Sequence, residues 1–183
     1  TELDPFNANA WNGLGRILYR LGNLDESQQA FEYILKLGDK NGLFQAVAYG
    51  SLGVIFQALG KLDETEEYYF KALEIFKSIG HQEGMATTYG NLGSIYEILG
   101  ELDKAVDLYT KSLDISKVLN RHESVANQYK NLGSIYQTRS ELGKAEELYL
   151  KSYEIFKSCG VLEGMASVYC CLGNICTKRG GLD

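Results

Sequence analysis

Two histidines and four cysteines are the side chains of this sequence best suited to act as nucleophiles, bases or metal ligands. The cysteines all lie near its end, at Cys159, Cys170, Cys171 and Cys176. The disulfide framework of a secreted protein would instead spread them along the chain. Cys170 and Cys171 are neighbours on a predicted helix and project about 100° apart, unlike the ligands of a C-x₂-C zinc site. We therefore expect no metal site and a reducing, cytoplasmic setting.

Catalytic groups are not predicted elsewhere either. His81 and His122 fall in predicted linkers, where a solvated histidine is the ordinary outcome. The glycines recur at regular intervals and do not form a phosphate-binding or dinucleotide-binding fingerprint. The carboxylates of "DETEEYY" and "KAEELY" resemble a solvated helix face interleaved with lysines. The sequence therefore predicts no enzyme and no cofactor.

Asparagine is the residue type here whose spacing points to recognition. The hexapeptide "NLGSIY" occurs at residues 91–96 and again at 131–136. An asparagine side chain offers two donors and an acceptor, so repeated copies can bond the backbone of a bound peptide whatever its side chains are. The alternative is structural, with Asn91 and Asn131 bonding a neighbouring helix.

The elements that carry these asparagines repeat with a period of 40 residues. Gly53, Gly93, Gly133 and Gly173 each follow a leucine, and Gly15 precedes Gly53 by 38. Within a repeat the apolar residues recur at helical spacing in two runs, which predicts a pair of helices. The predicted boundaries are 8–45, 46–85, 86–125 and 126–165, followed by a half repeat at 166–183.

The turns within the first three repeats read "LGNLDES", "LGKLDET" and "LGELDKA". The glycine of each turn can take the left-handed conformation that ends a helix, and we expect the aspartate to cap the next one, with Asp63 and Glu66 forming a capping box. The glycine of each Leu-Gly pair lies within a helix instead, at a cost of about 1 kcal/mol relative to alanine. That cost is understandable if a neighbouring helix packs too close for a Cβ.

Composition narrows the class of partner. A net charge of −6 and a pI near 5.0 disfavour nucleic acid, whose phosphates are bound by a surplus of Lys and Arg. Apolar residues make up 45% of the 183, but no apolar run reaches the roughly 18 residues that a membrane span needs. We expect a protein or peptide partner, no nucleic acid and no membrane.

The repeated columns resemble those of the tetratricopeptide repeat family. An aromatic residue, Leu-Gly and a second aromatic lie in the first helix, and the second helix has an aromatic sixteen residues after the glycine: Phe31, Tyr69, Tyr109 and Tyr149. The resemblance implies an all-α, right-handed α-solenoid of stacked antiparallel helical hairpins with about nine helices. The 40-residue period departs from the common 34, and Lys77, Lys117 and Lys157 stand where a closing proline is usual. Such long repeats are similar to those of kinesin light chains and Pins-type adaptors.

The resemblance also implies which side chains face a partner, since the first helices of such hairpins line a concave wall. Transferred column by column, it gives the peptide-binding residues Asn12, Arg16, Ser51, Gln57, Asn91, Ser94, Glu97, Asn127, Lys130, Asn131, Ser134, Gln137 and Asn174. Gly50 and Gly90 are expected to leave room for the peptide backbone. The chaperone-type carboxylate clamp of the family is not matched.

Two functions remain open at this point. The first is a non-enzymatic scaffold that binds an extended or helical peptide segment in the groove. The second is a sensory or regulatory segment of a larger multidomain signalling protein, packed on an effector domain. "DPFNANAW" with Pro5 and the final "RGGLD" indicate a segment of a longer array. Self-association is a third alternative, through terminal helices that expose residues such as Met165, Val168, Leu172 and Ile175.

Overall fold

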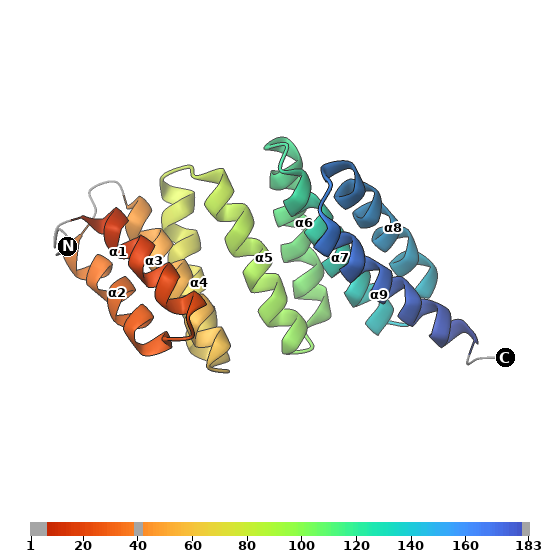
Figure 1. The fold of residues 1–183 in the computed structure, drawn as a ribbon, viewed down its shortest axis with the longest axis horizontal. Coiled ribbons are helices and arrows are strands. Elements are labelled where there is room, and N and C mark those ends of the chain that lie inside the picture. The colour runs from red at the N-terminus through yellow and green to blue at the C-terminus, as the bar shows by residue number, and fades with distance from the viewer. Residues whose placement is uncertain (1–6, 39–41, 181–183) are drawn as a thin grey trace. The chain divides into compact units, whose positions relative to one another are not determined.

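Nine α-helices make up the part of the chain that this computed structural model describes, residues 7–38 and 42–180, and these ranges contain no strand. The helices are α1 (Ala8–Arg20), α2 (Leu24–Leu37), α3 (Leu43–Ala58), α4 (Leu62–Ser78), α5 (Gln82–Ile98), α6 (Leu102–Val118), α7 (His122–Thr138), α8 (Leu142–Cys159) and α9 (Leu162–Gly180) (Figure 1). The predicted all-α fold of helical hairpins is confirmed. Pro5 and the last three residues of the chain, to which two of the sequence interpretations refer, lie outside the described residues.

The helices form two compact units, residues 1–88 (unit 1) and 89–183 (unit 2), so that α5 is divided between them. In unit 1, α1 packs against α2 and α3, and α3 packs against α4. In unit 2, α7 packs against α6 and α8, and α8 packs against α9. Each unit buries its own apolar core, in unit 1 around Phe31 and Leu52 and in unit 2 around Tyr109 and Ile135.

The glycine within each first helix lies against the aromatic ring of the second helix. A Cβ built on Gly53 or Gly93 would lie 2.6 Å from the ring of Tyr69 or Tyr109, and one on Gly15 or Gly133 would lie 2.7 Å from the ring of Phe31 or Tyr149. Real Cβ atoms do not approach ring carbons so closely, so only glycine fits at these four positions. The close helix approach expected from the sequence is therefore present.

The turn inside each hairpin is a Schellman motif, as the end of α3 illustrates. Gly60 has a φ of 73°, its N–H donates to Gln57 O at 3.0 Å, and the Lys61 N–H donates to Phe56 O at 3.0 Å. Lys61 is at the same time the N-cap of α4, so one residue closes one helix and opens the next. The expectation that Asp63 caps α4 through a capping box is therefore wrong. Asp63 lies in the first turn instead, where its negative charge interacts favourably with the helix dipole.

The junctions between successive hairpins are of two kinds. In unit 1 the ring of Phe76 on α4 contacts Gly84 on α5, and in unit 2 the ring of Phe156 on α8 contacts Gly164 on α9. Between α6 and α7 two serines take these places, with Ser116 Oγ and Ser124 Oγ 2.9 Å apart. The sequence carries a signal for this alternation that the 40-residue period hides: "EIFKSIGHQEGMA" at 74–86 is matched by "EIFKSCGVLEGMA" at 154–166, two periods later.

Candidate functional site

The side chains expected to face a partner come from the first helices of the hairpins. These are α1 and α3 in unit 1, and α7, α9 and the C-terminal part of α5 in unit 2. Most of them fall into three groups. Some accept hydrogen bonds from buried side chains, some line a cavity, and some make no side-chain hydrogen bond within the described residues.

The first group stands four residues after the Leu-Gly glycine and is bonded to the core tyrosines. Gln57 Oε1 accepts from the Tyr69 hydroxyl at 3.0 Å, and Gln137 Oε1 accepts from the Tyr149 hydroxyl at 2.8 Å. In these two hairpins the tyrosine of the second helix thus packs its ring on a glycine and donates its hydroxyl to a glutamine of the first helix. These glutamines have a structural function that the sequence interpretation did not assign to them.

Glu97 is the charged member of the same column. Its Oε2 accepts from the Tyr109 hydroxyl and its Oε1 from Ser134 Oγ, both at 2.8 Å, so two predicted site residues on α5 and α7 are brought together. The carboxylate is half-buried, and within the described residues no cation lies at ion-pair distance from it. Lys130 makes only a long contact, 3.4 Å, to Ser167 Oγ.

The core tyrosines are held in their neutral form. Burial raises the pKa of the Tyr69 and Tyr149 hydroxyls well above their ordinary value. Burial also raises the pKa of Tyr109, and the neighbouring Glu97 carboxylate raises it further, because an anion disfavours a phenolate beside it. The neutral hydroxyls can therefore serve as donors throughout the ordinary pH range.

The asparagines of α5 and α7 behave differently from the glutamines. Asn91, Asn127 and Asn131 are half-buried, and their side chains make no hydrogen bond to another residue in the described ranges. Ser94 is half-buried near them, and Asn174 is exposed on α9. The helix-to-helix bond weighed as the alternative for Asn91 and Asn131 is thus not formed among these residues.

The two glycines expected to leave room for a peptide differ from each other. A Cβ on Gly90 would lie 3.2 Å from Gln128 Nε2 and 3.5 Å from Ser112 Oγ, so the space beside Gly90 is filled by the packing of α6 and α7. The expectation for Gly90 is therefore wrong. A Cβ on Gly50 would meet only Ala72, at 3.9 Å.

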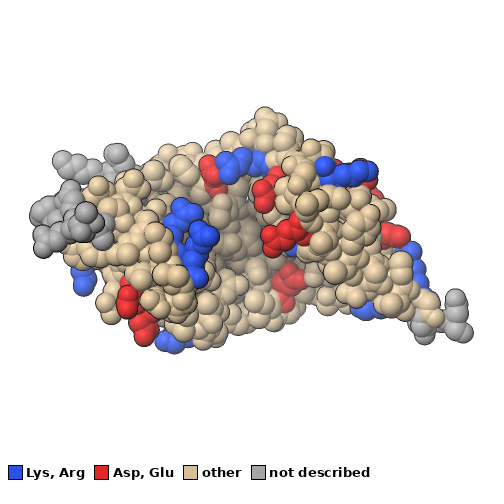
Figure 2. All heavy atoms as spheres, in the orientation of Figure 1, with Lys and Arg blue, Asp and Glu red and all other residues tan. Residues whose placement is uncertain are grey.

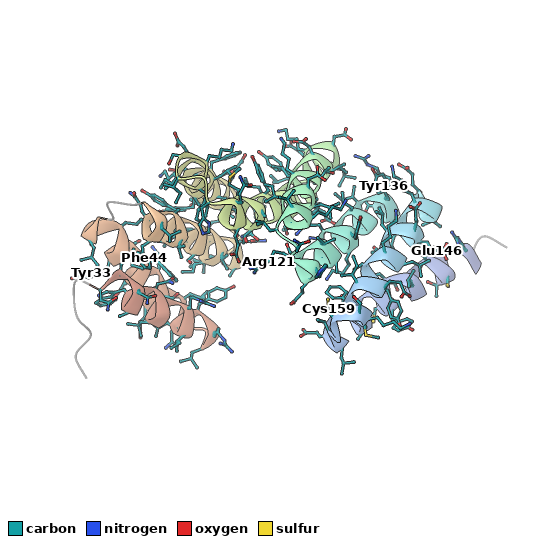
Figure 3. The ribbon with its side chains drawn as sticks, turned by 90° about the horizontal axis from the view of Figure 1, so that it is seen from above. Tyr33, Phe44, Arg121, Tyr136, Glu146 and Cys159 are labelled. Carbon is teal, nitrogen blue, oxygen red and sulfur yellow. The ribbon has the colours of Figure 1, made fainter. Side chains whose placement is uncertain are left out.

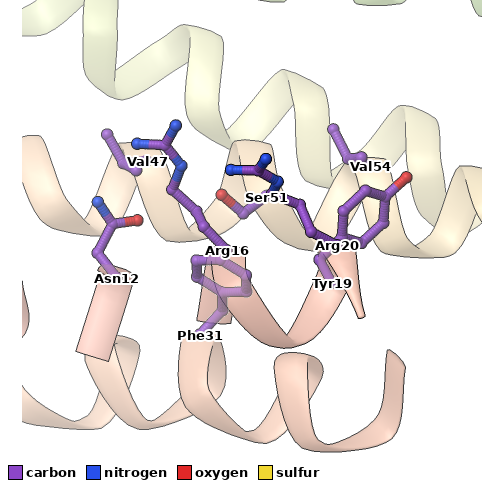
Figure 4. A pocket seen from close by; sticks show the side chains of 8 residues that line it. All are labelled: Asn12, Arg16, Tyr19, Arg20, Phe31, Val47, Ser51 and Val54. Atoms are coloured by element: carbon purple, nitrogen blue, oxygen red, sulfur yellow. The ribbon is translucent and has the colours of Figure 1, made fainter. Parts of the chain in front are cut away.

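In unit 1 the predicted residues Asn12, Arg16 and Ser51 come together around a cavity of about 410 Å³. Its remaining lining consists of Tyr19, Arg20, Phe31, Val47 and Val54, and Figure 4 shows both guanidinium groups pointing from α1 toward α3. The sequence interpretation left Val47 out of the site. It stands six residues before Gly53, in the same column that gave Asn127, so the signal was present.

No group of three or more His, Cys, Asp and Glu side chains in the described residues is placed to hold a metal ion. The four cysteines are free thiols, and Figure 3 shows Cys159 at the end of α8. Farther along unit 2, Glu146 of α8 (Figure 3) pairs with Arg179 of α9 at 2.8 Å.

The last helix covers more of its apolar side than the sequence indicated. Val168 and Ile175 are buried against α8 and its neighbours, and Met165 and Leu172 are partly buried, so the expectation that α9 exposes all four is wrong. Leu162 and Tyr169 are its exposed large hydrophobic side chains. None of the helices in the described ranges is long and apolar enough to cross a membrane.

Comparison with known proteins gives both sequence and structural matches. A model of the tetratricopeptide repeat matches residues 6–78, 44–117 and 84–158, whereas no curated protein sequence matches the chain. Among crystal structures, BtubC (BKLC) from P. vanneervenii has a TM-score of 0.72 at 18% identity, covering 97% of this chain and 84% of that one. MamA has a TM-score of 0.65 at 20% identity, covering 86% and 82%.

A further similar structure is that of a longer protein. Aspartyl phosphate phosphatase F from Bacillus subtilis has a TM-score of 0.85 at 12% identity over 92% of this chain. The chain spans 45% of that phosphatase. At these identities the structural similarities show the shared fold of helical hairpins and no more.

Proposed function

The chain belongs to the tetratricopeptide repeat family, and from that premise we propose that it is a non-enzymatic scaffold that binds a peptide segment along its first helices. Repeats of this family serve generally as protein-interaction scaffolds. The segment is extended or helical, and the predicted polar residues of α1, α3, α5, α7 and α9 contact it. The cytoplasmic setting expected from the free thiols belongs to the same proposal.

The observation that carries the proposal is the unused hydrogen-bonding capacity of Asn91 and Asn131. A half-buried amide without a partner loses part of its bonding to water and gains nothing from the protein. Such a cost is offset when a ligand supplies the missing partners. A peptide backbone does so, because it presents one N–H and one C=O per residue to an amide that both donates and accepts. Ser94 lies one turn along α5 from Asn91 and adds a hydroxyl to the same surface.

The glutamines four residues after the Leu-Gly glycine support this assignment to the asparagines. Gln57 and Gln137 are amides of similar chemistry on the same helices, yet the core tyrosines already bond them. The asparagines therefore remain available for a partner, whereas the glutamines fix the shape of the surface around them.

The test uses peptides selected from a randomised phage-displayed library on the intact chain. Asn91→Ala/Asn131→Ala is expected to weaken the selected peptides about tenfold or more by fluorescence anisotropy, since two lost hydrogen bonds are worth roughly 1–3 kcal/mol. The matched control is Gln29→Ala/Gln82→Ala, which removes two exposed amides outside the predicted set. Unchanged affinity together with an unchanged melting curve would exclude binding by these asparagines.

The second candidate is a sensory or regulatory segment that packs on an effector domain of a larger signalling protein. The similarity to less than half of a phosphatase structure favours it, because the same fold forms only part of that longer protein. The coding sequence around this chain distinguishes the two functions. The regulatory function is supported if the coding sequence specifies an adjacent nucleotide-binding or catalytic domain, and if that domain, expressed separately, co-purifies with residues 1–183. A coding sequence without such a domain contradicts the regulatory function.

A further inference from the structure

We propose that the unit 1 cavity between α1, α2 and α3 binds the carboxylate side chain of a glutamate or aspartate in the bound segment. This inference rests on the proposed peptide-binding function and adds a charge preference to it. Within unit 1, the cavity would make binding depend on the side chains of the segment.

The cavity places two cations on one helix face without an anion between them. Arg16 and Arg20 are four residues apart on α1, and like charges at this spacing repel each other. None of the eight lining residues is acidic, and in the described ranges no carboxylate lies within ion-pair distance of either guanidinium. Figure 2 shows Lys and Arg side chains gathered on this face of unit 1, beside α1. A bound anion would remove this repulsion.

The rest of the lining suits a charged group carried on a short apolar stem. The ring of Phe31 is almost fully buried at the base of the cavity, and Val47 and Val54 line its α3 side (Figure 4). Ser51 adds a hydroxyl on the α3 side. The methylenes of a glutamate can pack on this base while its carboxylate meets the guanidiniums. A volume of about 410 Å³ falls within the range of ordinary ligand pockets.

A carboxylate fits these donors better than a phosphate does. Each guanidinium can hold both oxygens of a planar carboxylate in a bidentate pair. A phosphate brings a second charge and a third oxygen, and its usual additional donors, a helix N-terminus or a lysine, are not among the lining residues. The chain itself carries a net charge of −6, which opposes a dianion more than a monoanion.

The experiment begins with the same randomised library, selected on the wild-type chain and on Arg16→Gln/Arg20→Gln. Wild type is expected to enrich peptides with Asp or Glu at one fixed position relative to an apolar residue, and the double variant to lose that enrichment while still selecting peptides. Lys36→Gln/Lys61→Gln removes the same charge from exposed sites outside the cavity and is expected to enrich the same acidic peptides as wild type.

A double-mutant cycle then measures the contact itself. For an enriched peptide, replacing its Glu by Gln is expected to weaken wild-type binding about tenfold or more, and binding to Arg16→Gln/Arg20→Gln less than twofold. Equal losses in the two proteins would overturn the proposal, as would tighter binding of the phosphoserine version than of the glutamate version. Acidic enrichment that survives in the double variant overturns it without touching the asparagine-based function, whereas failure of wild type to enrich any peptide overturns both.

Discussion

The hydroxyl of Tyr109 donates a 2.8 Å hydrogen bond to Glu97, a residue of the inner face, while its ring fills the space above Gly93 in the core. The same side chain therefore packs between two helices and also positions a polar group on the surface. Tyr69 and Tyr149 do the same for Gln57 and Gln137. The core and the candidate site are built from shared residues.

Replacing Glu97 by glutamine should preserve the hydrogen bond from Tyr109, because an amide oxygen accepts from the corresponding tyrosine in two of the other hairpins. We expect Glu97→Gln to change the free energy of unfolding by less than about 1 kcal/mol, and Glu97→Ala to lower it by about 1–3 kcal/mol through an unsatisfied buried hydroxyl. Urea titrations followed by circular dichroism measure both. Equal destabilisation by the two variants would show that the charge, and not the hydrogen bond, matters at this position.

Alkaline pH should unfold the chain through its core tyrosines. The folded pKa values of Tyr69, Tyr109 and Tyr149 lie above the ordinary value of about 10, so the folded state prefers the neutral form. Stability from this source is fully present below about pH 10 and is lost as the pH rises above it, because the unfolded chain then releases protons that the folded chain retains.

Urea midpoints between pH 8 and 11.5 test this expectation. Tyr109→Phe, which introduces the residue type found at Phe31 in the first hairpin, should make the loss of stability above pH 10 shallower. A profile that stays flat to pH 11.5 would contradict the buried, neutral state of these hydroxyls.

Alanine should have opposite effects at two glycines of the same column. Gly93→Ala places a Cβ 2.6 Å from the ring of Tyr109, which is fully buried and cannot move aside, so we expect a net loss of about 1–3 kcal/mol. Gly173 has no atom within 4 Å of an added Cβ, so Gly173→Ala should gain up to about 1 kcal/mol from helix propensity alone. Thermal melts of the two variants against wild type decide the point, and a Gly93→Ala protein as stable as wild type would contradict the close approach.

The serine junction between α6 and α7 should be convertible into the phenylalanine–glycine kind. Ser116 is buried, so Ser116→Phe alone should overpack the junction and destabilise by about 1–3 kcal/mol. Adding Ser124→Gly removes the Cβ that the new ring would meet, as at Gly84 and Gly164, and should restore most of that loss. The coupling is read from a double-mutant cycle of unfolding free energies, and strictly additive effects would contradict it.

The sequence was sufficient for the hairpins because their signals lie in repeated columns. Leu-Gly and an aromatic residue sixteen positions later predict a close helix pair, and Gly93 with Tyr109 forms one. The capping of α4 was not predictable in the same way, since Asp63 fits a cap by type and only the bond from Lys61 N–H to Phe56 O shows that the turn is too short for it.

The sequence predicted which residues lie at the candidate site better than it predicted their hydrogen bonds. Column positions brought Asn12, Arg16 and Ser51 to one cavity, because residues spaced by a helical turn or a repeat share a face. They could not separate Gln137, whose amide is occupied, from Asn131, whose amide is not. That difference depends on which way a tyrosine hydroxyl points from another helix, and no spacing within the first helix encodes it.

The two kinds of junction make the order of the hairpins part of what the sequence encodes. Deleting residues 82–121 would join α4 to α7 and set the ring of Phe76 against Ser124, where a side chain stands in the place of a glycine. Deleting residues 82–161 would instead bring Phe76 to Gly164, its natural kind of partner. The array should therefore tolerate the gain or loss of two hairpins together and be destabilised by the gain or loss of one. The smallest segment that can be duplicated without changing a junction is then 80 residues, twice the structural repeat of 40.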